Sequence, residues 1–265
     1  MRMITVEAIT ACLNQLAPPA LAEEWDNVGL LLGDPAAPVA RVMTCLTVTP
    51  ASVTEAVGRR AELVVTHHPV LLRPLRQITT ATPAGRDLLE LAAARIGVYS
   101  AHTAFDSASD GINQQLAASL DLSDIAPLVE QPGAGPPLGA GRHGRLPAET
   151  TVQLVAERLK EFLGVPALRV VGDPQRHIRQ LAVACGSGGG FLEAAVAAGC
   201  ELLVTGEAKF HSCLAAQAEG LALLLTGHFA SERFAMERLA RTLAGRFPEL
   251  EVWASKHETD PLITV

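Results

Sequence analysis

Two stretches of this chain repeat the same order of segments, and the repetition restricts the folds that the chain can adopt. Residues 41–102 and residues 179–228 each give a pattern of strand, helix, strand, helix and strand. In both stretches the second strand opens with Glu-Leu, and the third strand ends at a histidine, His102 or His228. Because β-α-β crossovers join parallel strands, the sequence predicts an α/β fold of two similar units with mostly parallel sheets.

The order of the segments also predicts how the two units divide the chain. We expect the first unit to comprise residues 1–128 and 229–265, and the second unit residues 129–228. The Gly- and Pro-rich stretch Gln131–Arg142 supports a boundary, since it cannot form a helix or a central strand. A last helix is expected to run from about Ser231 to Leu243.

Composition argues against some classes of partner. The chain of 265 residues carries a formal net charge of −7, which argues against a nucleic-acid backbone as its partner. No apolar run approaches the length that crosses a bilayer, so we expect no membrane-spanning segment. Because apolar residues make up 49% of the chain and aromatic residues only 4%, the core is expected to consist of Ala, Val and Leu side chains.

The cysteines indicate a reducing compartment. The five cysteines form no C-x-x-C pair, and Cys45 and Cys185 lie in apolar runs where a thiol acts as a small hydrophobic side chain. An odd number without close spacing is typical of a cytoplasmic protein rather than a secreted one with a disulfide framework. We therefore expect a cytoplasmic protein.

Four histidines follow the ends of expected strands, and two of them precede a carboxylate by four positions. Open α/β sheets bind their ligands at the carboxyl ends of strands, so side chains at these ends are candidates for a functional site. The candidate site residues are His67, His68, His102, Asp106, His228 and Glu232. Because they come from both halves of the repeat, a metal site is expected between the two units.

The types of these residues favour two divalent metal ions as the cofactor. His67 and His68 would point to opposite faces of an ideal strand, but Pro69 ends the strand and lets both rings enter one pocket. Glu232 lies near the expected start of the last helix, where the helix dipole favours a carboxylate, and it can bridge two cations. Nitrogen and oxygen ligands without thiolates suit Zn, Fe, Mn or Ni better than Ca or Mg, although the identity of the metal stays open.

Two metal ions about 3.5–4 Å apart can bridge a water molecule, lower its pKa and polarise a phosphoryl or carbonyl oxygen. This is the chemistry of hydrolases. His102 has two roles open to it, since it can complete the ligand set or act as a proton shuttle. We take His102 as the candidate catalytic residue.

Other polar residues near strand ends have a structural interpretation. The histidines expected to be ordinary surface or core residues are His143, His177, His211 and His257. Gly186–Gly190 lacks the spacing of a nucleotide-binding loop, so a tight turn is the better interpretation than a phosphate cradle. Asp26 is expected to have a structural role, at most supporting a metal ligand, and the role of Glu207 stays open.

A set of motifs occurs in a fixed order along the chain: "WDNVGLLLGDP", "VVTHHPVLLRPL", "YSAHTAFDSASDGIN", "ACGSGGG" and "TGHFASER". In these motifs the chain resembles the Nif-three-like dinuclear metal-binding family, whose bacterial members are commonly labelled GTP cyclohydrolase I type 2 homologues. The resemblance runs from near Ile4 to the C-terminal "TDPLITV", which is essentially the whole chain.

The resemblance implies a toroidal homohexamer of two-unit subunits, with dinuclear metal sites that face the interior. It also implies a set of metal ligands, which are His67, His68, Asp106, His228 and Glu232 in this chain, with His102 nearby. The chain departs from the family pattern at Leu46–Pro50, where Leu-Thr-Val-Thr-Pro replaces the common Leu-Asp-Val-Thr-Pro. Since the five ligands are all present, the departures concern substrate contacts rather than metal binding.

Two functions of different classes are open on the sequence. The first is metal-dependent hydrolysis of a nucleotide-like substrate, with the ring opening of GTP implied by the family label. The second is non-enzymatic: a metal-binding oligomeric scaffold or regulator, or a protein that handles the metal itself. An open dinuclear site with a proton shuttle favours hydrolysis, whereas the chain has no convincing motif for guanine or a triphosphate.

Overall fold

The computed structural model describes residues 3–131 and 138–263, and it confirms the α/β class of the fold. Part of the expected boundary stretch Gln131–Arg142 therefore lies outside the described residues. Within the described ranges, every helix is too short or too polar to serve as a bilayer-crossing segment.

The chain forms two compact units, and each is built from two separate stretches of sequence. The first comprises Met1–Phe105 and Ala235–Thr259, and the second comprises Asp106–Phe234 and Asp260–Val265. The sequence-based division at residues 128 and 228 stays a prediction about domains.

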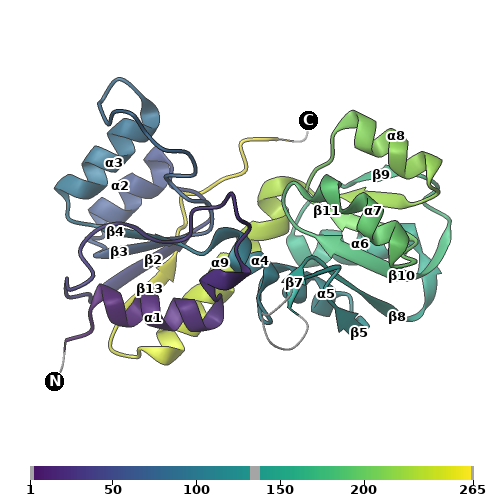
Figure 1. The fold of residues 1–265 in the computed structure, drawn as a ribbon, viewed down its shortest axis with the longest axis horizontal. Helices are drawn as coiled ribbons and strands as arrows, with labels where there is room; N and C mark the ends of the chain where they lie inside the picture. The colour runs from purple at the N-terminus through teal and green to yellow at the C-terminus, as the bar shows by residue number, and fades with distance from the viewer. Residues whose placement is uncertain (1–2, 132–137, 264–265) are drawn as a thin grey trace. The chain divides into compact units, whose positions relative to one another are not determined.

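A five-stranded sheet forms the centre of the first unit, in the order β1-β4-β3-β2-β13 (Figure 1). The strands are β1 (Gly29–Leu32), β2 (Arg41–Cys45), β3 (Leu63–Thr66), β4 (Gly97–Ser100) and β13 (Glu251–Ala254). The last four strands pair in parallel, whereas β1 pairs antiparallel with β4. The carboxyl ends of β2, β3 and β4 consequently lie at one edge of the sheet, where open α/β sheets bind ligands.

Helices cover both faces of this sheet (Figure 1). On one face lie α2 (Pro50–Gly58) and α3 (Pro83–Ala93), and on the other lie α1 (Val6–Leu16) and the part of α9 (His228–Arg246) that belongs to this unit. Successive side chains of a strand point to opposite faces, so Met43 and Cys45 of β2 share the core with side chains of α2 and α3. Thr44, between them, donates a hydrogen bond of 2.8 Å to the backbone oxygen of Met236 in α9. The short helix η1 (Pro19–Leu21) follows α1.

The second unit contains a six-stranded sheet in the order β5-β8-β10-β11-β12-β9 and a two-stranded sheet of β6 and β7. The strands are β5 (Ser123–Ala126), β6 (Val129–Glu130), β7 (Gly139–Ala140), β8 (Arg142–Thr151), β9 (Arg169–Val171), β10 (His177–Ala184), β11 (Leu202–Thr205) and β12 (Ala222–Leu225). β10, β11 and β12 are parallel, and antiparallel strands flank them. The expected repeat is confirmed, because these three strands and their connecting helices follow the order of β2, β3 and β4.

Several helices pack on the second sheet. They are α5 (Ile112–Ser119), α6 (Val152–Leu163), η2 (Gly188–Phe191), α7 (Leu192–Ala197) and α8 (Phe210–Ala218), and the last two residues of α4 (His102–Ser107) also belong to this unit. α7 contacts β11, and α8 contacts β12 and β9. Small side chains such as Ala184, Ala195 and Ala216 fill this core together with leucines, as the low aromatic content predicts.

α4 and α9 each begin at a histidine directly after a strand. Gly227, with φ of 90°, turns the chain from β12 into His228, whereas His102 itself adopts a φ of 28° after β4. Positive φ costs glycine little but strains a histidine, and such strain is commonly found at functional sites. The expected start of the last helix at Ser231 is therefore wrong, since the helix begins at His228 and places Glu232 one turn further along the same face.

A buried arginine anchors the end of α4 in the second unit. Arg142 is 2% exposed, and its Nη2 donates to the backbone oxygens of Ser107 and Ala108 at 2.9 and 2.8 Å. Its Nη1 donates to the backbone oxygens of Gly139 and Gly141 at 2.7 and 2.6 Å. One guanidinium thus satisfies the carbonyls that follow the predicted ligand on α4.

We expect Arg142→Met to lower the free energy of unfolding by about 3–5 kcal/mol, because it leaves several buried carbonyls without their donor. Arg145→Met is the matched control, since Arg145 is exposed on the same strand. It should change the free energy of unfolding by less than about 0.5 kcal/mol. Urea unfolding followed by circular dichroism measures both variants, and equal effects would contradict the anchoring role.

Candidate metal centre

Three of the predicted site residues lie together in the first unit. His67 and His68 follow β3, and His102 follows β4. One ring nitrogen from each lies within 4.8 Å of the others, which is close enough for the group to hold a metal ion. The ring centroids of His67 and His68 are 5.1 Å apart, so the two neighbouring rings face the same space, as a strand that ends at Thr66 allows.

A buried carboxylate holds the ring of His102. The side chain of Asp26 is 0% exposed, and its Oδ1 lies 2.7 Å from Nδ1 of His102. Its Oδ2 accepts hydrogen bonds from the backbone N–H and the hydroxyl of Thr103 at 3.1 and 2.5 Å. Burial raises the pKa of Asp26, but the hydrogen bonds from His102 and Thr103 outweigh it and lower the pKa from 3.8 to about 2. The ionised carboxylate favours a proton on Nδ1 and directs Nε2 away from Asp26.

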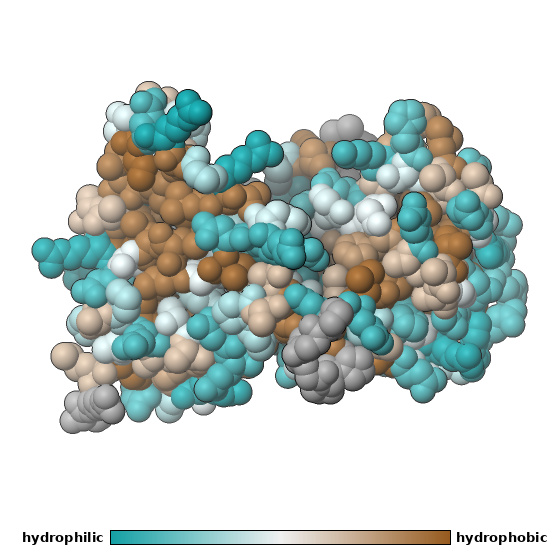
Figure 2. Space-filling view, in the orientation of Figure 1, coloured by the Kyte–Doolittle hydropathy of each residue, from teal (hydrophilic) through white to brown (hydrophobic). Residues whose placement is uncertain are grey.

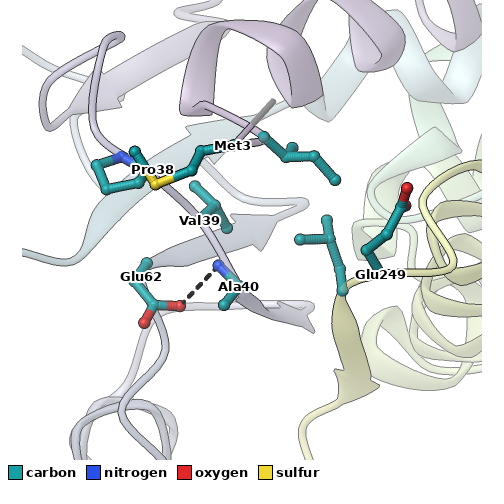
Figure 3. Close-up of a pocket in the computed structure, with 8 residues that line it drawn as sticks. Met3, Pro38, Val39, Ala40, Glu62 and Glu249 are labelled. Carbon is teal, nitrogen blue, oxygen red and sulfur yellow. Dashed lines mark hydrogen bonds between the residues drawn. The ribbon is translucent and has the colours of Figure 1, made fainter. Parts of the chain in front are cut away.

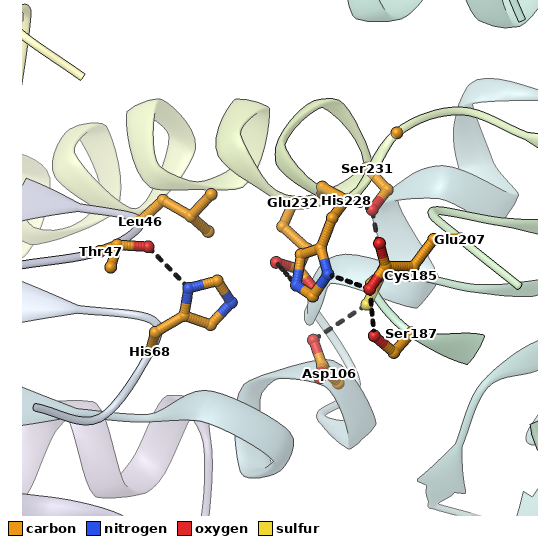
Figure 4. A network of polar contacts seen from close by, with 12 residues as sticks. Leu46, Thr47, His68, Asp106, Cys185, Ser187, Glu207, His228, Ser231 and Glu232 are labelled. Carbon is orange, nitrogen blue, oxygen red and sulfur yellow. Dashed lines mark hydrogen bonds and ion pairs between the residues drawn. The ribbon is translucent and has the colours of Figure 1, made fainter. Parts of the chain in front are cut away.

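Thr47 holds the ring of His68 in a comparable way. Thr47 follows β2, and its Oγ1 lies 2.7 Å from Nδ1 of His68 (Figure 4). The backbone N–H of His68 also donates to the backbone oxygen of Leu46 at 2.8 Å. A hydroxyl can donate or accept, so this contact orients the ring without deciding by itself which ring nitrogen carries the proton.

In the second unit, His228 lies between two carboxylates. Its Nδ1 is 3.1 Å from Oε1 of Glu207, which follows β11, and its Nε2 is 3.2 Å from Oε2 of Glu232 (Figure 4). Glu207 also accepts a hydrogen bond of 2.6 Å from the hydroxyl of Ser187. The hydrogen bond and charge of Glu232, assisted by Glu207, raise the pKa of His228 from 6.5 to about 9 despite partial burial. A metal that binds His228 through Nε2 has to displace a proton from this ring.

Asp106 is held against the end of β10 in the second unit. Its Oδ1 accepts a hydrogen bond of 3.0 Å from the thiol of Cys185. Asn113 links the same two elements, because it donates to the backbone oxygen of Asp106 at 3.2 Å and accepts from the backbone N–H of Cys185 at 2.8 Å. Burial, followed by the charges of Asp106 and Glu232, raises the pKa of the Cys185 thiol well above 9.0, so the thiol keeps the proton that it donates. Cys185 is therefore a hydrogen-bond donor to a predicted ligand and more than a hydrophobic side chain.

Gly186 leaves the space that the Glu232 carboxylate occupies. Its φ is 59°, and a Cβ at this position would lie 2.2 Å from Oε1 of Glu232. Its backbone N–H donates to the hydroxyl of Ser231 at 2.9 Å. The Gly186–Gly190 stretch continues into the helix η2, which agrees with a tight turn.

The two groups share a feature that fits metal binding. Nδ1 of His68, His102 and His228 lies in each case against a hydroxyl or carboxylate oxygen. Histidines that bind metals commonly have their second ring nitrogen held in this way, which orients the other nitrogen toward the metal. The nitrogen and oxygen donors of these groups suit Zn, Fe, Mn or Ni.

A cavity of about 370 Å³ lies elsewhere in the first unit (Figure 3). It is lined by Met3, Ile4, Pro38, Val39, Ala40, Glu62, Glu249 and Leu250. Ala40 and Glu62 immediately precede β2 and β3, so the cavity lies at the amino ends of these strands. The histidines follow the carboxyl ends, and the cavity is therefore separate from the candidate metal centre.

The sequence predicts at most a supporting role for Asp26, and it misses three other residues that hold the predicted site residues, which are Thr47, Glu207 and Cys185. Thr47 and Glu207 each lie two residues after a strand, β2 or β11, so their positions resemble those of the histidines, but neither stands in a ligand motif. Cys185 gives an apolar signal in the sequence, and Asp26 is far from His102 along the chain. Only the folded structure brings these four residues to their partners.

Comparisons with known proteins agree with the fold and show the family of the chain. The family model of Duf34/NIF3 (NGG1p interacting factor 3) matches residues 4–261. A protein of Streptomyces coelicolor named GTP cyclohydrolase 1 type 2 homolog is 36% identical over 263 residues, which cover 96% of this chain and 92% of that protein. Protein NIF3 homolog of Schizosaccharomyces pombe is 33% identical over 262 residues, which cover 93% of each chain.

A solved structure shows the same fold over the whole chain. The structure of a Bacillus cereus protein related to NIF3 aligns with 100% of both chains at a TM-score of 0.93 and 23% sequence identity. The likeness at this identity concerns the fold.

We expect the stability of the metal-free protein to depend on pH through His228. Because the pKa of His228 rises from 6.5 to about 9 on folding, the protonated ring contributes stability that is present below pH 6.5 and is lost as the pH rises through about 9. The ring is partly exposed, so we expect a loss of about 1–2 kcal/mol. Urea unfolding across this pH range measures the loss, and His228→Gln should remove it. A wild-type protein with the same pH dependence as the variant would contradict the assignment.

Gly186→Ala should displace the carboxylate of Glu232 and lower the pKa of His228 from about 9 toward 6.5. Gly199→Ala is the matched control, because Gly199 also has a positive φ, of 71°, but a Cβ there meets nothing within 4 Å. An NMR titration of the imidazole in metal-free protein measures the pKa of His228 in both variants. An unchanged pKa in Gly186→Ala would show that the contact does not set the charge of His228.

Proposed function

Since the chain belongs to the Duf34/NIF3 family, we propose that it holds a dinuclear metal centre and hydrolyses a nucleotide-like substrate. The observation that carries this proposal is the set of three histidines whose Nδ1 atoms are held by oxygen atoms behind them. This arrangement orients Nε2 for a metal. Holding a histidine ring in one geometry costs free energy, so the arrangement favours a function for these histidines.

Both units supply donors to the proposed centre. The ligands are His67, His68, Asp106, His228 and Glu232. The first unit contributes two imidazoles, and the second contributes two carboxylates and one imidazole, so the two units together offer the nitrogen and oxygen donors that two divalent ions require. We propose that the two sets bind the same pair of ions.

His102 is the proposed proton carrier of the reaction. The divalent ions would supply the Lewis acidity that polarises a phosphoryl or carbonyl oxygen. With Nδ1 held at 2.7 Å by Asp26, His102 can take up or release a proton at Nε2. The ionised Asp26 stabilises the imidazolium that forms when Nε2 is protonated, because the two groups are in direct contact.

GTP is the first substrate to test, because curated relatives carry the name GTP cyclohydrolase 1 type 2 homolog. Opening the ring of a purine with release of a formyl group requires water and a proton donor. His102 provides the second of these at the candidate centre.

We also propose that the chain acts as a homohexamer in the cytoplasm. The support for assembly is exposed apolar surface on the first unit, which gathers around α2 and α3 (Figure 2). Leu72, Leu75, Ile78 and Leu89, in and before α3, are 39–49% exposed. Exposed apolar patches commonly mark contacts with other protein surfaces. The five cysteines form no C-x-x-C pair, which supports a reducing compartment.

Glu232→Ala should abolish turnover by the metal-reconstituted protein, because it removes a proposed metal ligand. Glu237→Ala is the matched control, since Glu237 is an exposed residue of the same helix. We expect activity on GTP or on a member of a phosphoester panel to fall by at least about 100-fold in Glu232→Ala, and to persist in Glu237→Ala. Size-exclusion chromatography with light scattering checks that assembly is retained.

Wild-type protein that holds two metal ions tightly but turns over none of these substrates would contradict the hydrolase. That outcome would favour a metal-binding scaffold or regulator, or a role in metal handling. Wild-type protein that binds no divalent metal would contradict the dinuclear centre itself.

A further inference from the structure

A carboxylate near the C-terminus is bound by the loop that follows β2 in the first unit. The backbone N–H of Leu46 donates to Oε1 and Oε2 of Glu258 at 2.8 and 2.9 Å. The backbone N–H of Thr47 donates to Oε1 of the same carboxylate at 2.8 Å. Successive backbone N–H groups that converge on one anion form a nest, and hydrogen bonds to a charged acceptor are stronger than neutral ones.

The segment that carries Glu258 is itself held by a buried carboxylate, that of Glu55. The side chain of Glu55 is 4% exposed and accepts hydrogen bonds from the hydroxyl of Ser255 at 2.7 Å and from the backbone N–H groups of Lys256 and His257 at 3.0 and 3.2 Å. It also accepts from Nε1 of Trp253 at 3.0 Å. These contacts fix the chain after β13, and the fixed segment holds Glu258 against the loop that follows β2.

The same loop controls both the backbone and the ring of His68. The backbone oxygen of Leu46 accepts from the N–H of His68 at 2.8 Å and from the hydroxyl of Thr66 at 3.1 Å. The hydroxyl of Thr47 lies 2.7 Å from Nδ1 of His68 (Figure 4). Any shift of the Leu46–Thr47 peptide therefore moves both contacts of His68 together.

The direction of the Thr47 side chain depends on how its own backbone is held. Its carbonyl oxygen accepts from the hydroxyl of Ser52 at 3.2 Å, and its N–H is the group that binds Glu258. Glu258 thus fixes the amide side of Thr47, and Ser52 fixes the carbonyl side. His68 depends on this support because its partner is a neutral hydroxyl, whereas His102 is held directly by a charged carboxylate.

We propose that Glu258 is a positioning residue for His68, and that it acts through Thr47. The inference rests on the proposed function, because it matters to the protein only if His68 binds a metal. The C-terminal segment then completes the metal centre without touching the metal, from a position remote in the sequence.

A double-mutant cycle between Glu258 and Thr47 tests this proposal. The variants are Glu258→Gln, Thr47→Val and the double variant, and the control is Glu251→Gln, an exposed glutamate of the adjacent strand β13. We expect Glu258→Gln and Thr47→Val each to weaken the binding of Zn²⁺ by about 10-fold, as for other residues that orient a metal-binding histidine. The double variant should bind Zn²⁺ no more weakly than either single variant, because both changes disrupt the same series of contacts, from Glu258 through Thr47 to His68.

An NMR measurement on metal-free protein separates this proposal from the proposed function. Long-range ¹H–¹⁵N spectra of the imidazoles report the tautomer and mobility of His68, and we expect both to change in Glu258→Gln and not in Glu251→Gln. Unchanged His68 signals, or losses of Zn²⁺ affinity that simply add in the double variant, would overturn the positioning role. If the wild type binds no Zn²⁺, the proposed function fails, and the His68 signals alone decide whether Glu258 positions the ring.

Discussion

The candidate centre depends on one constraint, which is that parallel strands of each unit end at a common edge of their sheet. A residue that follows one strand then lies beside the residue that follows the next. Thr47 after β2 reaches His68 after β3, and Glu207 after β11 reaches His228 after β12. The repeat therefore places a hydrogen-bonding partner behind a histidine in both units, and this is what makes each histidine suitable for a metal rather than merely polar.

Much of the fold could be predicted from the sequence, because its central strands are short apolar runs and its helices begin at recognisable caps such as Thr49 and Thr151. The long strand β8 was not expected, since its sequence, with Pro147, Glu149 and two threonines, carries no apolar alternation. The start of α9 at His228 was placed too late, because the turn is made by Gly227 and not by a capping side chain.

Only part of the candidate site could be predicted from the sequence. Histidines after strands give a signal in the sequence, and Asp26 was expected at most to support a metal ligand, but Thr47, Glu207 and Cys185 gave no such signal. Asp26 lies in a loop before β1, and its link to His102 depends on the fold of the whole unit. The sequence around Cys185 indicates only an apolar strand, but in the structure its thiol lies 3.0 Å from Oδ1 of Asp106. The buried charges of Asp26 and Arg142 are each satisfied by several hydrogen bonds, which fix the positions of the groups around them.

Anomalous X-ray diffraction from crystals of the zinc-loaded protein, recorded at the zinc absorption edge, tests the dinuclear centre most directly. We expect two anomalous peaks per chain, bound by imidazole nitrogens of His67, His68 and His228 and by carboxylate oxygens of Asp106 and Glu232. Zinc found only at other histidines, such as the exposed His177, or a single ion held by one unit alone, would contradict it.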